Sequence, residues 1–383
     1  MGRVRVSPRE ARPRGNETPA LRVGLVIYGG LEFPSGGFLY DRMLVEILKQ
    51  SGDEVEIISL PWESYGRCVL HNFDRGIRGR LRAWRGDILL QDELVHPSLF
   101  LQNRGLRQAL AVPVVSIVHH LASSERERMM PRGAIRLVER AYLRSVDGFI
   151  YSGEGTRTAV QELRGCPCTG LVANPAGDRL RCGISDTELE ARASGGAPLR
   201  VLFVGSLIPR KGLLTLLESL TLSRTGDWVL TVAGPRTADA AYARHVDRAV
   251  REWGLQDRVR MLDHLDDAGL AAELRAHQVL AVPSTYEGFG IVYLEAMGFG
   301  VVPIGSTAGG AAEIIEDGTS GFLVPPGDSR ALAAVITRLG ADRVLLASCA
   351  RAARKRFVQF PGWAQRMAEV REWLHAFARQ ARN

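Results

Sequence analysis

Leu199-Arg200-Val201 opens the second half of this chain and echoes Leu21-Arg22-Val23 near its start. Both triplets begin a short apolar run, and in each half small residues and then a segment of helical period follow that run. Because the same alternation of strand, loop and helix begins twice, the sequence predicts two similar α/β domains.

The expected strands are apolar throughout and are separated by helical segments, which is typical of a parallel sheet covered on both faces. In the first half they lie at 23–28, 55–60, 87–91, 114–118, 148–151 and 171–173, with helices at 37–50, 134–144 and 155–163. In the second half they lie at 202–204, 229–233, 259–262, 279–282 and 301–304. The predicted fold is two doubly wound, Rossmann-like domains that face an interdomain cleft, since ligands bind beyond the carboxyl ends of such strands.

The length of 383 residues suits two domains of about 100 to 200 residues each. Linker composition at 193–198 divides the chain into domains at 21–195 and 196–358. Residues 359–383 carry an amphipathic helix at 363–378, which is expected to pack back toward the N-terminal domain. Residues 1–20 hold five arginines, two glutamates and three prolines, and are expected to form a disordered basic tail.

The composition excludes several classes of protein. No apolar run approaches the roughly 18 residues of a membrane-spanning helix, and the N-terminus has no secretory apolar region. Five cysteines, an odd number, indicate a reducing compartment, and Cys166, Cys168 and Cys182 lack the further ligands of a zinc site. We therefore expect a cytoplasmic protein, whose net charge of +7 permits association with phosphates or an anionic surface.

Two loops that follow the first strand of each half carry groups suited to a diphosphate. Gly36 and Gly37 stand at the start of a helix, where backbone amides and the helix dipole favour an anion; a loop that needs unusual φ is the alternative. In the second half Arg210 and Lys211 lie at a strand-to-helix corner, and Lys211 is one of only three lysines in the chain. It would either offset diphosphate charge or be a solvated loop charge.

The most specific segment is 283–297, Pro-Ser-Thr-Tyr-Glu-Gly-Phe-Gly-Ile-Val-Tyr-Leu-Glu-Ala-Met. Glu287 follows a strand, Glu295 stands eight residues later, and Gly288 and Gly290 expose amides at the start of the next helix. This spacing allows one acid near a sugar and one near a ribose. Two solvated acids that flank a helix are the alternative.

This segment resembles the Glu, seven residues, Glu motif of the retaining glycosyltransferases of family 4, which have the two-domain GT-B fold. Residues 205–212 look like that family's diphosphate loop, and residues 309–313 with 317–325 look like its next motif block. The resemblance extends from Leu21 onward and is strongest between Val201 and Asp328.

The resemblance implies roles for particular residues. Glu287 matches the acid that holds donor-sugar hydroxyls, Glu295 the acid that binds the nucleotide ribose, and His119 the active-site histidine beside the transferred sugar. The further donor contacts that it implies are Gly36, Gly37, Arg210, Lys211, Phe289, Gly290, Ile291 and Val292. Ser206 stands where the family commonly has a second phosphate-binding arginine, so either Arg210 substitutes or the grip is weaker. The chain also departs from the family pattern at Asp263, which leaves the base preference open, and at Asn174-Pro175.

The implied reaction is transfer of a hexosyl-type sugar from a nucleotide-diphosphate donor to an acceptor hydroxyl with retention of configuration, in glycolipid, polysaccharide or glycoconjugate synthesis. No metal or other cofactor is implied, and no cluster of Asp and His at the strand ends is expected to hold one. A nucleotide-sugar epimerase of the same architecture and a non-catalytic sugar-nucleotide binder are the alternatives. An epimerase would convert the donor without an acceptor, and a binder would show no turnover.

Two segments of the N-terminal half could meet the acceptor, and each has two interpretations. Residues 92–98 follow a strand end and form either an acceptor loop or a plain helix-entry turn. Arg132, Arg136, Arg140 and Arg144 recur every four residues. They indicate either a peripheral contact with the anionic inner face of a membrane and a lipid-linked acceptor, or a solvated basic face. Nucleic acid is not expected as a partner, because no recognised nucleic-acid module accompanies the charge.

Overall fold

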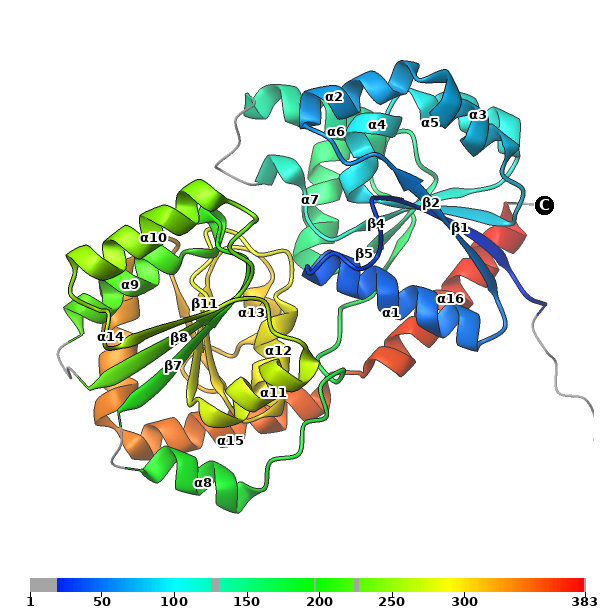
Figure 1. Ribbon diagram of the computed structural model, residues 1–383. Coiled ribbons are helices and arrows are strands. Elements are labelled where there is room, and N and C mark those ends of the chain that lie inside the picture. The colour runs from blue at the N-terminus through cyan, green and yellow to red at the C-terminus, as the bar shows by residue number, and fades with distance from the viewer. Residues whose placement is uncertain (1–18, 125–130, 196–197, 224–226, 382–383) are drawn as a thin grey trace, which may run out of the picture.

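Two parallel, six-stranded sheets organise the chain, one in each half (Figure 1). The computed structural model describes residues 19–124, 131–195, 198–223 and 227–381. Nearly all of the predicted basic tail therefore lies outside the described residues.

The N-terminal sheet has the strand order β2-β1-β3-β4-β5-β6. Its strands are β1 (Arg22–Tyr28), β2 (Glu54–Leu60), β3 (Ile88–Asp92), β4 (Val114–Val118), β5 (Gly148–Tyr151) and β6 (Gly170–Val172). The helices of this half are α1 (Gly36–Gln50), α2 (Tyr65–Leu70), α3 (Arg75–Ala83), α4 (His96–Leu99), α5 (Gln102–Leu110), α6 (Arg132–Leu143) and α7 (Glu154–Arg164), with short 3-10 turns η1 (His71–Phe73), η2 (Glu93–Val95) and η3 (Ala122–Ser124).

The C-terminal sheet has the order β12-β11-β10-β7-β8-β9. Its strands are β7 (Leu199–Val204), β8 (Trp228–Ala233), β9 (Val259–Leu262), β10 (Val279–Ala281), β11 (Val302–Ser306) and β12 (Phe322–Val324). The remaining helices are α8 (Asp186–Ser194), η4 (Pro209–Lys211), α9 (Leu213–Leu222), α10 (Ala240–Glu252), α11 (Asp267–Ala276), α12 (Ile291–Gly298), α13 (Ala311–Ile314), α14 (Ser329–Ala341), α15 (Arg343–Gln359) and α16 (Trp363–Gln380).

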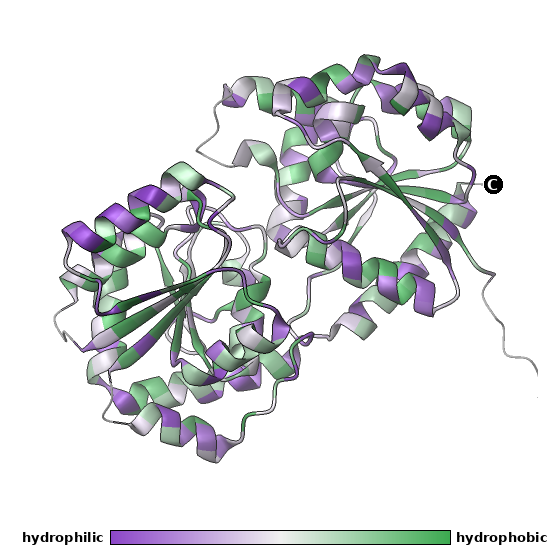
Figure 2. Ribbon diagram, viewed as in Figure 1, coloured by the Kyte–Doolittle hydropathy of each residue, from purple (hydrophilic) through white to green (hydrophobic). Residues whose placement is uncertain are grey.

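Burial on both faces explains why the central strands are largely apolar. β1 is buried at every residue after Arg22, and the strands of both sheets are the most hydrophobic part of the interior (Figure 2). Helix α1 buries Phe38, Leu44 and Leu48 against one face, and its start is capped by the Ser35 hydroxyl, which accepts a hydrogen bond from the Phe38 amide. Each such buried side chain contributes about 1.5 to 3 kcal/mol.

The predicted strands and helices all form, with ends within three residues of those expected. Strand β12 was not predicted. It has only three residues and pairs with β11 alone at the edge of its sheet, so it leaves no readable period in the sequence.

Two helices show how the halves are joined. α8 packs on α15 beside the C-terminal sheet, and α16 lies along α1 of the N-terminal half (Figure 1). There Arg371 of α16 donates to the buried carboxylate of Asp53 at 2.6 Å. The division at residue 195 stays a prediction, and the packing of α8 favours a boundary before residue 186.

Candidate active site

A cavity of about 790 Å³ lies between the two halves, at the carboxyl ends of their strands. All the residues for which the sequence predicts a catalytic or donor-binding role line it. Gly36, Gly37 and His119 come from the N-terminal half, and Arg210, Lys211, Glu287, Phe289, Gly290, Ile291, Val292 and Glu295 come from the C-terminal half. The structure thus brings these residues to one place, while their individual roles stay predictions.

The position of Lys211, in the loop after β7, depends on the glycine that follows it. Gly212 begins α9 with φ +73°, and a Cβ there would lie 2.2 Å from the carbonyl oxygen of Pro283. The amide of Thr285 donates to the carbonyl of Arg210 at 2.8 Å, which holds the same two segments together. The diphosphate-type loop and the Glu287 segment therefore pack as one unit.

Glu287 lies at the centre of a cationic cluster. Its Oε2 accepts from Lys211 Nζ at 2.7 Å and from Ser284 Oγ at 3.0 Å, and Arg210 Nη1 lies 3.8 Å away. Burial alone would raise the pKa of Glu287, but the charges of Lys211 and Arg210, with the two hydrogen bonds, lower it to about 2. Glu287 is therefore a carboxylate at neutral pH.

The glycine-rich block at 309–310 supports the backbone of Glu287. A parallel bridge pairs Glu287 with Gly309, and the Gly310 amide donates to the Glu287 carbonyl at 2.8 Å. Gly309 has φ +92°, and a Cβ on it would lie 2.0 Å from that carbonyl oxygen. Only glycine allows this approach. The two motif blocks noted in the sequence therefore act as one structural element.

Glu295 lies on α12 and is 3% exposed. Arg179 Nε donates to its Oε1 at 2.5 Å, and the same guanidinium pairs with Asp267. Burial raises the pKa of Glu295 in spite of Arg179. Arg179 also lines the cavity, and the sequence does not predict this because nothing in its local pattern distinguishes Arg179 from other loop arginines.

His119 directly follows β4 and packs on the start of α1. A Cβ on Gly37 would lie 3.0 Å from the imidazole Cδ2, so a glycine there leaves room for the ring. The His119 amide donates to Glu93 at 3.0 Å, and its carbonyl accepts from Ser152 Oγ at 2.8 Å. Burial lowers the pKa of His119, which favours the neutral imidazole.

Residues 186–356 match the family described as Glycosyl transferases group 1. The glycogen synthase of Mycobacterium tuberculosis is 30% identical over 295 residues, which cover 74% of this chain and 67% of that protein. The chain belongs to this glycosyltransferase family.

Two further comparisons extend this finding. The phosphatidyl-myo-inositol mannosyltransferase of Mycobacterium leprae is 27% identical over 351 residues, which cover 85% of this chain and 89% of that protein. The sucrose-phosphate synthase from Thermosynechococcus elongatus has a similar structure, with a TM-score of 0.78 and 22% identity over 93% of this chain and 99% of that chain. The predicted GT-B fold is confirmed, and the protein is a glycosyltransferase that uses a nucleotide-sugar donor.

The glycosyltransferase contains a buried acidic cluster that the sequence does not predict. Asp41 of α1 and Asp92 of β3 lie beside His119, with carboxylate oxygens 3.5 and 3.8 Å from its Nε2. Burial raises the pKa of Asp41 to about 7 and that of Asp92 to about 8. Within the described residues neither Asp41 oxygen has a hydrogen-bond donor, and a proton shared between the two carboxyl groups would join one of these oxygens to Asp92.

The same three side chains could hold a metal ion, because their ligand atoms all lie within 4.8 Å of one another. The expectation that no Asp and His cluster forms at the strand ends is therefore wrong. The reason is that Asp41 comes from the interior of α1 and reaches the cluster only when α1 packs across the sheet.

The segment 92–98 forms η2 and α4, as the helix-entry interpretation predicts. Asp92, His96 and Ser98 are buried, and only Glu93 and Leu94 of this segment line the cavity. Most of this segment therefore does not line the cavity.

Glu313 makes a contact between the two halves. Glu313 of α13 accepts from the amides of Glu154 and Gly155, at 3.0 and 2.9 Å, at the start of α7. A carboxylate at a helix N-terminus is favourable by about 0.3 to 1 kcal/mol. Glu313 thus joins the glycine-rich block of one half to a helix of the other.

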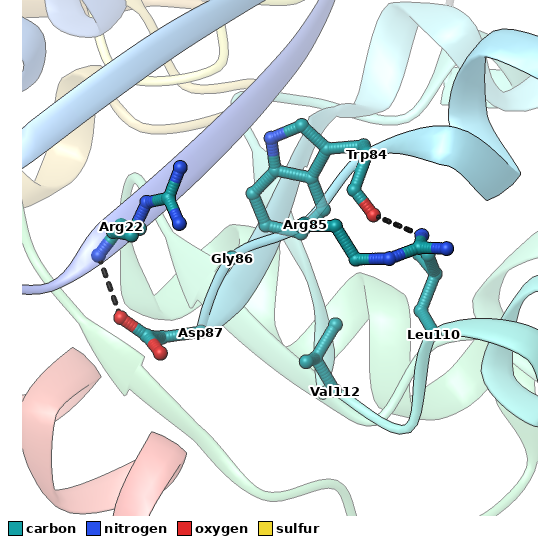
Figure 3. Close-up of a pocket in the computed structure, with 7 residues that line it drawn as sticks. All are labelled: Arg22, Trp84, Arg85, Gly86, Asp87, Leu110 and Val112. Atoms are coloured by element: carbon teal, nitrogen blue, oxygen red, sulfur yellow. Dashed lines mark hydrogen bonds between the residues drawn. The ribbon is translucent and has the colours of Figure 1, made fainter.

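A second cavity of about 190 Å³ lies near the amino ends of β1 and β3 (Figure 3). The Trp84 ring packs on Gly86 beside this cavity, and Asp87 accepts from the Arg22 amide at 2.7 Å. It contains none of the predicted site residues, and ligands of doubly wound sheets bind at the opposite, carboxyl ends.

Proposed function

We propose that this glycosyltransferase moves a hexosyl-type sugar from a nucleoside-diphosphate donor to an acceptor hydroxyl, with retention of configuration and without a metal. The observation that carries the proposal is the convergence of Lys211, Arg210 and the start of α12 on Glu287 within the large cavity. Retention rests on the resemblance of residues 283–297 to the family 4 motif.

The proposed mechanism assigns the negative charge of the leaving diphosphate to Lys211, Arg210 and the first amides of α12. No side chain caps that helix, and Gly290, with φ +96°, lets a ligand approach its amides closely. Glu287 would orient the sugar and stabilise its developing positive charge. A carboxylate with a pKa of about 2 is a weak base, so the departing phosphate is the better acceptor for the proton of the incoming hydroxyl.

Metal independence follows from these cations, which supply the positive charge that a metal would otherwise provide. The Asp41, Asp92 and His119 cluster is the place where the described residues could hold an ion, but its two carboxyl groups are fully buried and can instead share a proton.

For the membrane and the cellular location, we propose a cytoplasmic enzyme that acts on a lipid-linked acceptor and touches the inner face of the membrane through α6. Arg136 and Arg140 are exposed there, and Leu137 between them is 70% exposed. Arg132 and Arg144 are exposed as well, and their guanidinium groups also donate to the carbonyls of Ser123 and Arg164. In the described residues no helix is long and apolar enough to cross a membrane.

The test is an assay with a panel of nucleoside-diphosphate sugars and acceptor sugars, with the anomeric configuration of the product read by NMR. An α-linked donor sugar should give an α-linked product only when an acceptor is present. Conversion of the donor alone would identify an epimerase, and donor binding without turnover on any acceptor would identify a binder.

A further inference from the structure

Two exposed aromatic rings stand together at the carboxyl edge of the N-terminal sheet. Phe33, in the loop after β1, is 45% exposed, and Trp62, just after β2, is 48% exposed. Their ring centroids are 4.8 Å apart. Phe38 lies beneath both, at 5.5 Å from Phe33 and 5.7 Å from Trp62, and Tyr28 stacks on Trp62 from the side of the sheet. The pair therefore has a rigid aromatic base and an open outer surface.

This aromatic pair adjoins the large cavity. Glu32 and Pro34, on either side of Phe33, line that cavity, and Phe38 directly follows Gly37, on which His119 packs. Arg42 holds the loop by donating to the carbonyls of Leu31 and Phe33, at 2.5 and 3.5 Å. The rings therefore stand next to the N-terminal lining of the cavity, whose cations Arg210 and Lys211 come from the C-terminal half.

The aromatic surfaces of Phe33 and Trp62 and the charges beside them indicate which class of ligand fits here. Covering an exposed aromatic ring is favourable because it removes apolar surface from water. The faces of a pyranose or cyclitol ring carry C–H groups that can pack on such a ring. Glu32, next to Phe33, lines the cavity and offers carboxylate acceptors for hydroxyl groups, whereas both carboxylate oxygens of Glu63, next to Trp62, are paired with Arg67 and His71. The surface therefore suits a neutral, polyhydroxylated ring.

The geometry points to Phe33 and Trp62 as the acceptor subsite, which stacks on a neutral sugar or cyclitol ring of the acceptor and places its hydroxyl toward His119. This inference rests on the proposed function and names the acceptor class for that site. An anionic head group or an alkyl chain is the alternative occupant that the test separates.

The first measurement does not require catalysis. Methyl glucosides, methyl mannosides and a neutral cyclitol are titrated while tryptophan fluorescence is followed. A saturable change should occur in the parent and be lost in Trp62→Phe, because that variant removes the reporting indole. Trp253→Ala removes an indole of similar exposure, 41%, at the end of α10, and should keep the change. No saturable change in the parent, or its persistence in Trp62→Phe, overturns the inference even if donor binding is intact.

The second measurement uses any acceptor that the transferase assay identifies. Trp62→Ala and Phe33→Ala should each raise the KM for the acceptor about tenfold, with the affinity for nucleoside diphosphate unchanged. Trp62→Phe should recover part of the loss, which separates stacking from misfolding. An unchanged KM overturns the subsite, and so does a KM that depends on alkyl chain length in the parent but not in Trp62→Ala. Failure of the proposed function would instead appear as lost donor binding or as no transfer to any acceptor.

Discussion

The ammonium group of Lys211 lies 2.7 Å from the carboxylate of Glu287, so the predicted diphosphate cation and the predicted sugar acid form an ion pair with each other. Both side chains are largely buried, which strengthens the attraction relative to a surface pair. Donor binding has to redistribute this lysine between the carboxylate and the phosphates. Diphosphate affinity and the protonation of Glu287 are therefore coupled through one residue.

Lys211→Ala should weaken binding of nucleoside diphosphate by about 10- to 100-fold, because a charge-assisted hydrogen bond of about 1.5 to 3 kcal/mol is lost. Isothermal titration calorimetry measures this directly. Lys355→Ala, which removes an exposed lysine of α15, is the matched control and should bind like the parent. Equal affinity of Lys211→Ala and the control would show that Arg210 alone carries the charge.

Glu287→Gln should lower kcat by at least about 100-fold and leave nucleoside-diphosphate binding intact or stronger. The amide keeps the shape but cannot stabilise positive charge on the sugar, and Lys211 and Arg210 no longer have to share their charge with a carboxylate. Single-turnover rates and diphosphate titration separate the two effects. A variant with parental turnover would remove Glu287 from the catalytic machinery.

Glu287 should also contribute to the loss of folding stability at acid pH. Its pKa in the folded protein is lowered to about 2, so its ion pair stabilises the fold above the unfolded value near 4.5 and is lost as pH falls from there toward 2. Urea unfolding at a series of pH values between 2 and 5 gives the free energy of unfolding at each pH. This free energy should change less steeply with pH in Glu287→Gln than in the parent. Identical slopes would mean that Glu287 is not paired in solution.

Glu295→Ala should lower the free energy of unfolding by about 3 kcal/mol and weaken nucleotide binding, because it leaves the guanidinium of Arg179 without its buried partner. Arg179→Met should cost as much, because Glu295 would then be the uncompensated buried charge. The double variant Glu295→Leu with Arg179→Met should recover much of the stability but not the nucleotide affinity. Recovery of both would make this pair purely structural.

Activity should survive a chelator, since Lys211 and Arg210 provide the positive charge at the diphosphate. The parent and Asp41→Asn are assayed with and without EDTA, and then with added Mn²⁺. Loss of activity in the parent, restored by Mn²⁺, would assign a metal to the Asp41, Asp92 and His119 cluster.

The pair of Asp41 and Asp92 should make the protein less stable as pH rises. Their folded-state pKa values are raised to about 7 and about 8, so above the unfolded value near 4 the folded chain keeps protons that the unfolded chain has lost. The free energy of unfolding should fall from about pH 4 to pH 8, and Asp41→Asn should flatten this fall. Asp257→Asn, at an exposed site, is the control. A profile for Asp41→Asn that follows the parent would contradict the shared proton.

Vesicle binding tests the basic face of α6. Arg136→Glu with Arg140→Glu should reduce co-sedimentation with anionic vesicles at low salt, because each arginine contributes about 1 kcal/mol near such a surface. Arg244→Glu with Arg248→Glu has the same spacing on exposed positions of α10 and should sediment like the parent. Equal sedimentation of all three proteins would leave α6 as a solvated face.

In the described residues, the sequence by itself determined every strand except β12, the helices that it predicts at 37–50, 134–144, 155–163 and 363–378, and the glycine-rich corners of both halves. Hydrophobic period is local, and a strand buried on both faces has to be apolar whichever neighbour it pairs with. The candidate residues at 287–295 and at 210–211 were predictable for the same reason, since a residue that follows a strand in a doubly wound sheet lies at the ligand edge.

Only the tertiary structure decided which charges meet. Lys211 reaches Glu287 across 76 residues of sequence, Arg179 reaches Glu295 across 116, and Glu313 reaches the start of α7 across more than 150. Asp41 gives no local sign of its role, because an acid within a helix normally faces water. Its burial beside Asp92 and His119 arises from the packing of α1 across the sheet, and such long-range packing leaves no periodic mark in the chain.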